Sequence, residues 1–217
     1  MKIKYLGHSS FKIEDNGVSF VFDPHINIGY DYPSVSADLC LVSHNHYDHN
    51  NVGGVKNVKE VVVDSSLAYN GINVESFKSF HDEDKGAKRG VNFIHKVTTK
   101  DATYLHLGDF GESPDKYDFS SFIGVDFLFL PVGGTYTIDA DGAKKIVDEI
   151  RPRFIVPMHY KTEKSTVDIA SIDGFLRYFM TSKLIYLSNE VDLTDILAEN
   201  LSFGKVLIFD MPDGQTF

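Results

Sequence analysis

Short runs in which apolar and polar positions alternate dominate the first part of the chain. Such alternation is typical of strands that bury one face. It occurs at residues 2–6, 11–14 and 18–22, and Asn16-Gly17 between the last two runs indicates a hairpin turn. Further apolar runs predict strands at residues 39–42, 61–63, 92–97, 103–107, 127–130, 154–157 and 206–209.

Two helical patterns appear in the second half. The first stripe consists of Ala143, Ile146, Val147 and Ile150. Asp139 or Thr137 could cap its start, and Pro152 marks its end. The second stripe consists of Ile172, Phe175, Leu176 and Phe179. Strands that later alternate with helices predict an α/β fold of stacked sheets covered by helices. No repeat or linker divides the sequence, so we expect a single domain over residues 1–217.

Composition narrows the class of protein. The chain has 217 residues, 42% of them hydrophobic, which is enough for a full core. Its net charge of −10 disfavours general binding to nucleic acid or to a membrane surface. The one cysteine, Cys40, lies in an apolar run and cannot form an internal disulfide. No signal-peptide-like stretch or membrane-length apolar run occurs, so we expect a cytoplasmic protein and leave a homo-oligomer open.

A cluster of metal-binding residue types follows the apolar run at residues 39–42. It contains His44, His46, Asp48 and His49. Imidazole and carboxylate groups bind zinc, manganese and iron. In extended backbone His44 and His46 point to the same side and can share an ion, and a turn can send Asp48 and His49 toward a second ion. A solvated, histidine-rich loop is the alternative, but the density of ligands at the end of a buried strand favours a metal site.

The spacing His44-x-His46-x-Asp48-His49 matches the HxHxDH signature of the metallo-β-lactamase superfamily, which the chain resembles from about residue 7 to 161. The resemblance implies a four-layer αββα sandwich of two mixed β-sheets flanked by helices. It also implies two divalent ions, zinc first, with manganese or iron as alternatives. The first ion would be bound by His44, His46 and His81, and the second by Asp48, His49 and His159. Asp109 would bridge both ions, and Asp23 would support the metal loop.

Flanking motifs are similar to those of a narrower branch of the superfamily. They are Leu6-Gly7-His8-Ser9, the run at residues 131–137, and Pro157-Met158-His159-Tyr160. The branch includes L-ascorbate 6-phosphate lactonase and is similar to the N-acyl-phosphatidylethanolamine phospholipases. His8 belongs to the first motif, and either a pocket role or a structural hydrogen bond would explain it.

Three residues are catalytic candidates. Asp48 could combine metal binding with accepting a proton or a hydrogen bond from the nucleophile. His106 rivals His81 as a ligand, but it lies three residues before Asp109. Side chains three apart on one strand face opposite ways unless Gly108 makes a turn, so we expect His106 to support a ligand or contact substrate.

Tyr160 is the third candidate. It follows His159 and could donate a hydrogen bond to an oxyanion, or it could simply pack beside the metal loop.

The resulting hypothesis is a dinuclear metal-dependent hydrolase that acts through a metal-bound hydroxide on a small ester, lactone or phosphate ester. The alternatives are a phosphodiesterase or nuclease, a non-catalytic metal-binding module, and a redox protein, for which the chain has no room for a flavin domain. Basic residues near the expected ligands favour an anionic substrate, unless they are ordinary solvated side chains. They are Lys85, Lys88, Arg89, Lys161 and Lys164.

Overall fold

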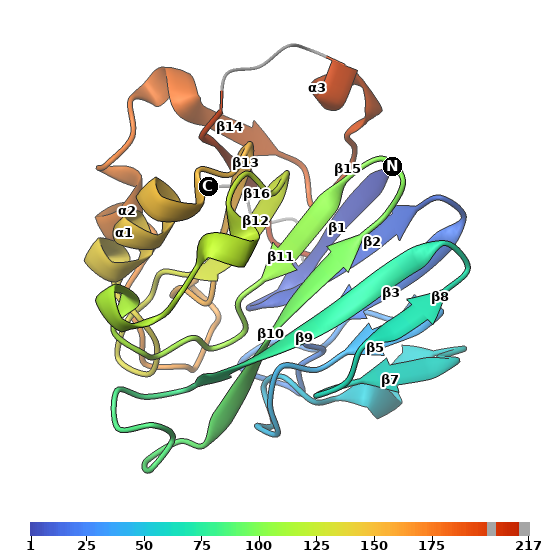
Figure 1. The fold of residues 1–217 in the computed structure, drawn as a ribbon, viewed down its shortest axis with the longest axis horizontal. Coiled ribbons are helices and arrows are strands. Elements are labelled where there is room, and N and C mark those ends of the chain that lie inside the picture. The colour runs from blue at the N-terminus through green and yellow to red at the C-terminus, as the bar shows by residue number, and fades with distance from the viewer. Residues whose placement is uncertain (199–202, 213–217) are drawn as a thin grey trace.

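Two mixed β-sheets form the centre of the computed structural model, which describes residues 1–198 and 203–212 (Figure 1). The six-stranded sheet has the order β15 (Glu190–Asp192), β1 (Lys2–Gly7), β2 (Ser10–Asp15), β3 (Val18–Phe22), β5 (Leu39–Leu41) and β7 (Glu60–Val62). The eight-stranded sheet has the order β14 (Leu184–Leu187), β16 (Lys205–Phe209), β13 (Phe154–Met158), β12 (Phe127–Pro131), β11 (Thr103–His106), β10 (Val91–Thr98), β9 (Ile72–Phe80) and β8 (Leu67–Tyr69).

Each sheet combines antiparallel and parallel pairing. β1, β2 and β3 form an antiparallel meander, and β5 and β7 then add in parallel. In the other sheet β8 to β11 are antiparallel, whereas β11, β12, β13, β16 and β14 are joined in parallel. The mixed two-sheet arrangement confirms the predicted fold class.

Aromatic side chains fill the space between the sheets. Phe11 and Phe22 of the six-stranded sheet contact Phe129 of the other sheet, with ring centroids 4.8 and 5.7 Å apart. Phe20 meets Tyr104 in the same way at 5.5 Å. The alternating positions recognised in the sequence therefore point into this shared core.

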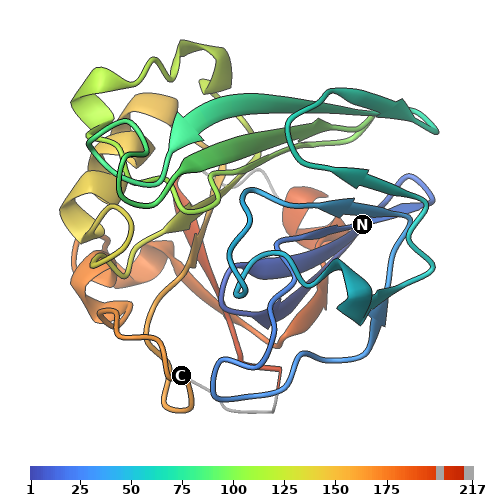
Figure 2. The same cartoon turned by 90° about the horizontal axis from the view of Figure 1, so that it is seen from below.

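Helices cover the outer face of the eight-stranded sheet (Figures 1 and 2). α1 (Ala140–Ile150) begins at Asp139, whose side chain accepts a hydrogen bond from the backbone N–H of Gly142 at 2.9 Å. The apolar stripe predicted for this helix is its buried face, so the prediction is confirmed. α2 (Asp173–Leu176) is shorter than its stripe, because the chain continues to Phe179 in tight turns.

The outer face of the six-stranded sheet has a different cover. Leu6, Val21 and Cys40 pack there against Val35 and Val55. The cover consists of β4 (Val35–Ser36), β6 (Val55–Lys56), the 3-10 helix η1 (Val52–Gly54) and loops. Among the described residues, a two-stranded sheet, a 3-10 helix and loops thus replace the helical layer expected on this face.

The remaining helices are short. They are the 3-10 helices η2 (Pro114–Lys116), η3 (Ser120–Phe122) and η4 (Thr181–Lys183), and the α-helix α3 (Thr194–Ala198). None of the described helices has the length and hydropathy needed to cross a membrane.

Candidate metal centre

Every ligand predicted from the sequence follows the end of a strand. The HxHxDH segment comes after β5, His81 directly after β9, and His159 directly after β13. Asp109 follows β11 after a two-residue turn. Strand ends hold the backbone rigidly, so side chains just beyond them can be positioned closely.

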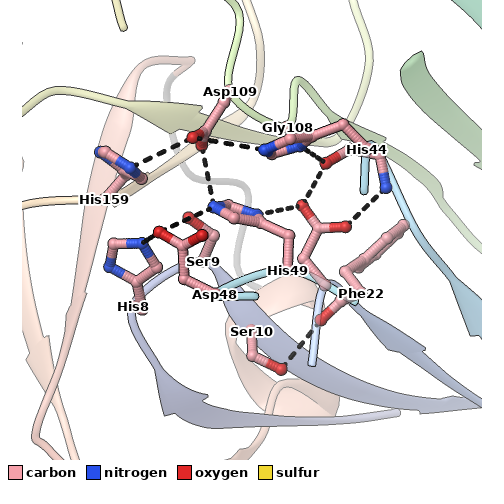
Figure 3. A network of polar contacts seen from close by, with 12 residues as sticks. His8, Ser9, Ser10, Phe22, His44, Asp48, His49, Gly108, Asp109 and His159 are labelled. Carbon is pink, nitrogen blue, oxygen red and sulfur yellow. Dashed lines mark hydrogen bonds and ion pairs between the residues drawn. The ribbon is translucent and has the colours of Figure 1, made fainter. Parts of the chain in front are cut away.

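Asp109 lies at the centre of the cluster (Figure 3). Its Oδ2 atom is 3.1 Å from His81 Nε2, 3.3 Å from His159 Nε2 and 3.7 Å from His44 Nε2. Its Oδ1 atom is 3.2 Å from His49 Nε2. One buried carboxylate therefore contacts imidazoles from both predicted ligand sets, as expected of a bridging group.

The donor atoms divide into two compact sets on either side of this carboxylate. His44, His46 and His81 each offer one donor atom, and the three atoms lie within 4.8 Å of one another. The second set consists of Asp48, His49, His159 and His8, and their four donor atoms also lie within 4.8 Å of one another. Two ligands on opposite sides of one ion lie about 4 Å apart at ordinary bond lengths, so each set can hold an ion.

Unpartnered buried atoms provide a test of whether these residues fit a metal. The Nε2 atom of His44 is buried and has no hydrogen-bond partner among the described residues, and the buried His49 Nε2 and Asp109 Oδ1 atoms lie 3.2 Å apart and make no hydrogen bond to any other described residue. Leaving such atoms unpaired is costly, and coordination to a metal would satisfy them. The donor set therefore fits borderline divalent ions.

Asp23 supports the cluster from behind. Its carboxylate accepts hydrogen bonds from the Ser43 backbone N–H at 2.7 Å and the Ser43 hydroxyl at 2.6 Å. It also bonds to His49 Nδ1 at 2.8 Å, which turns Nε2 of that ring toward Asp109. Burial alone would raise the pKa of Asp23, but the charge and hydrogen bond of His49 outweigh it and hold the pKa below its usual value. Asp23 thus fixes the orientation of a predicted ligand.

The protonation of the histidines follows from burial and neighbouring charge. Burial, followed by the charge of His49, lowers the pKa of His44 to about 3, so its ring is neutral and has a lone pair to offer. Burial opposes the charged form of His49 too, but Asp109 and Asp23 together raise its pKa well above the ordinary value. Metal binding at His49 must therefore displace a proton.

Gly108 makes the turn that separates His106 from Asp109. Its backbone has φ +56°, and an added Cβ would lie 2.3 Å from Asn92 Oδ1 and 2.4 Å from Ser43 Cβ. The same Asn92 oxygen accepts the Asp109 backbone N–H at 2.9 Å. The sequence alone did not decide whether Gly108 makes a turn. The turn determines where the Asp109 side chain points.

His106 lies behind the cluster. The Gly108 N–H donates to Nδ1 at 3.1 Å, so Nε2 carries the proton and donates to the Ser9 carbonyl at 2.9 Å. The ring stacks on Phe22 at 4.6 Å and is fully buried. Of the two roles expected for His106, this placement agrees with supporting the ligand loops and corrects the expectation of substrate contact.

Tyr160 also points away from the cluster. Its side chain is buried in the core beneath α1, and its hydroxyl lies against the hydroxyl of Tyr5. The oxyanion role expected for Tyr160 is corrected here, because packing holds its hydroxyl in the interior. Tyr47 and Tyr136 lie at the site instead.

A cavity of about 400 Å³ opens over the ligands. The described residues that line it are His46, Tyr47, Asp48, His81, Arg89, Asp109, Tyr136, His159, Thr166, Val167 and Asp168. Arg89 is the one lysine or arginine in this lining, and its guanidinium lies 5.1 Å from the centre of the Tyr136 ring. The cavity is thus large enough for a small molecule and carries one fixed positive charge.

The other basic residues considered in the sequence are not part of that lining. Lys161 Nζ donates to the carbonyls of Ser165 and Val167, and Lys88 pairs with Asp84 in solvent. Lys161 is thus held by its own loop, whereas Lys88 lines a neighbouring cavity together with His81 and Arg89.

The loop at residues 82–90 presents Arg89. The Asp82 carboxylate accepts the backbone N–H groups of Asp84, Gly86, Lys88 and Arg89 at 2.8–3.0 Å. This closed turn could not be derived from apolar spacing. The run of turn-forming residues after His81 was its signal in the sequence.

Comparison with known proteins agrees with this geometry. The model of the β-lactamase superfamily domain matches residues 2–159. The chain belongs to this family. A UPF0173 metal-dependent hydrolase from Carboxydothermus hydrogenoformans is 30% identical over 202 residues, covering 75% of this chain and 85% of the relative. A UPF0173 protein from Pyrococcus abyssi is also 30% identical, covering 82% and 90%.

A solved structure is similar to this chain over nearly its full length. It is a Thermotoga maritima protein, provisionally described as a zinc-dependent hydrolase of the metallo-β-lactamase superfamily. It superposes with a TM-score of 0.76 at 28% identity and covers 97% of this chain and 98% of its own. The family predicted from the HxHxDH segment is therefore confirmed.

Proposed function

We propose that this metallo-β-lactamase family member is a dinuclear metal-dependent hydrolase of a small ester, lactone or phosphate ester. The observation that carries the proposal is the position of Asp109, within 3.1–3.7 Å of imidazole nitrogens from both ligand sets. Relatives named metal-dependent hydrolases support the reaction class.

The ligand sets assign the residues of each site. His44, His46 and His81 would hold the first ion, Asp48, His49 and His159 the second, and Asp109 both. Ions bound here supply Lewis acidity and lower the pKa of a water molecule toward neutrality. Zinc is the first expectation, and manganese or iron would also suit nitrogen and carboxylate donors.

The chain's own residues perform the remaining tasks. Asp48 lines the cavity, and the neighbouring His8 and His49 rings outweigh the effect of burial and hold its pKa below the usual value, so the carboxylate is ionised. An ionised carboxylate there can accept a hydrogen bond or a proton from the attacking nucleophile and hold its direction of approach. Tyr136 and Tyr47 form apolar walls with hydroxyl groups that can orient the substrate.

The substrate is proposed to be a small anion. The cavity has the volume of a small-molecule site, and Arg89 places one positive charge beside the ligands. A nucleic acid would need a track of basic groups, and a single arginine does not provide one. The nuclease alternative is therefore not favoured.

A turnover assay tests the proposal. Metal-loaded protein should hydrolyse at least one member of a panel of lactones, carboxylic esters and phosphodiesters. Activity should vanish on chelation and return with added metal. The variant Asp48→Asn, purified and loaded in the same way, should lose at least about 100-fold in kcat. Two bound metals without turnover on any member of the panel would favour a non-catalytic metal-binding module.

A further inference from the structure

His8 occupies a turn that its backbone adopts only under constraint. It joins β1 to β2 with φ +54°, a left-handed conformation that is uncommon outside glycine. Two donors hold its carbonyl oxygen at 3.2 Å, namely the backbone N–H of His159 and the hydroxyl of Tyr5. A strained residue tied to a predicted ligand by its own backbone suggests a role for its side chain.

The ring of His8 faces the second ligand set (Figure 3). Its centroid lies 4.4 Å from that of His159 and 5.3 Å from that of His49. Its Nε2 atom lies 3.5 Å from Asp48 Oδ2. The residue is 2% exposed, and Nε2 has no hydrogen-bond partner among the described residues.

Two other buried histidines show the contrast. In His25 the ring nitrogens lie 2.7 Å from the Ile26 carbonyl and 3.1 Å from the Leu6 carbonyl, and the one N–H of the neutral ring donates to one of the two. In His106 both nitrogens bond to backbone groups. Nε2 of the buried His95 also has no hydrogen-bond partner among the described residues, but His95 belongs to no group of potential ligands, whereas the unpartnered nitrogen of His8 lies among the predicted metal ligands.

We propose that His8 is a nitrogen donor to the second metal site, beside Asp48, His49 and His159. The four donor atoms lie within 4.8 Å of one another, a spacing that one ion can span. The inference rests on the dinuclear function proposed above and adds an eighth protein ligand to it. The second site then has one donor more than the first, and the two ions are held unequally.

Two variants separate coordination from a hydrogen bond to Asp48. His8→Asn removes the imidazole with a residue that tolerates the left-handed backbone, so the turn is kept. His8→Gln retains an N–H donor that can reach Asp48 but not the imidazole nitrogen. His25→Gln is the matched control, because that histidine is buried nearby and bonds only to backbone.

The readouts are metal affinity and metal spectroscopy, both independent of turnover. Affinity is measured by competition of metal-free protein with a chromophoric chelator, and the ligand field by the visible spectrum of cobalt-loaded protein. Both His8 variants should bind one ion as the unmodified protein does and the second at least about 10-fold more weakly, with altered cobalt bands. The control should show neither change, and circular dichroism of the metal-free proteins should confirm folding.

Other outcomes overturn the inference. Normal affinity and cobalt bands in His8→Gln would reduce His8 to a hydrogen-bond donor, and the same result in His8→Asn would remove any role at the metal. If His8→Asn fails to fold, His8→Gln decides alone. An unmodified protein that binds fewer than two ions contradicts the dinuclear function itself. Two ions with unaffected variants contradict only the role of His8.

Discussion

His106 lies close to Asp109 in the sequence, and His81 lies close to it in space. The structure gives the two histidines different surroundings. Nε2 of His81 is 3.1 Å from Asp109, and the side chain lines the cavity. His106 is enclosed, with both nitrogens bonded to backbone. The two histidines should therefore respond differently to the same substitution.

We expect His81→Ala to remove one metal or to weaken its binding strongly while the metal-free protein remains folded, because the ring packs against the rings of other predicted ligands, His44 and His46. His106→Ala should leave metal content near that of the unmodified protein. It should lower the free energy of unfolding by about 2–4 kcal/mol, since a cavity forms beside Phe22 and two backbone groups lose partners. Elemental analysis and denaturant unfolding measure the two effects, and a reversed pattern would exchange the roles of the two residues.

Strands whose apolar positions alternate, or that are apolar throughout, were predicted close to their observed bounds. Examples are β3, β5 and β12, which are buried on the face or faces their sequences indicate. β9 was not predicted, because its sequence mixes Ser76 and Lys78 with apolar residues and is partly buried on both faces. α2 was predicted too long, because an apolar stripe indicates a buried face whether the chain is helical or turns tightly there.

The residues of the candidate site also differ in how far the sequence could predict them. The ligands in the HxHxDH segment are local in sequence, so their chemistry was visible from spacing. His81, Asp109 and His159 needed the order of motifs in a known family. The positions of Arg89 and Tyr136 in the site could not be predicted, because they lie on two loops that meet only in the folded protein. The direction of the Asp109 side chain depends on the turn at Gly108, which strand periodicity does not predict.

Asp23 follows the end of β3 and hydrogen-bonds to Ser43 and His49, which lie beyond the end of β5. Asp23→Asn keeps the shape of the side chain but removes the carboxylate that holds His49 Nδ1. We expect metal affinity to fall by about 10- to 100-fold, because His49 loses its fixed tautomer and orientation. Asp38→Asn is the matched control, since Asp38 also accepts an N–H and a hydroxyl from a serine, Ser19, without contacting a ligand. Equal metal affinity in the two variants would contradict this role of Asp23.

The charge of the whole molecule is −10, whereas the cavity over the ligands contains Arg89. An acidic protein repels anions at long range, so an anionic substrate would be bound by this local positive group together with the proposed metal ions. Asp82 fixes the loop that carries Arg89 through four backbone hydrogen bonds. The guanidinium is therefore presented at a defined place, beside Tyr136.

We expect Arg89→Ala to raise the KM for an anionic substrate by about 10-fold and to change kcat little, because a binding charge away from the reacting bond is lost. A neutral ester of similar size should be affected much less. Lys88→Ala is the control, since Lys88 lies on the same loop but pairs with Asp84 in solvent. Steady-state kinetics on both substrates measure the effect, and equal changes for the charged and neutral substrates would exclude anion binding by Arg89.

The number of metal ions per chain tests the central claim most directly. Seven side chains on two sheets converge so that one carboxylate, Asp109, lies between two sets of donors. Protein purified without chelator, or reconstituted with zinc, manganese or iron, should contain close to two equivalents of metal per chain by elemental analysis. One equivalent or less after reconstitution with each of the three metals would contradict a dinuclear centre.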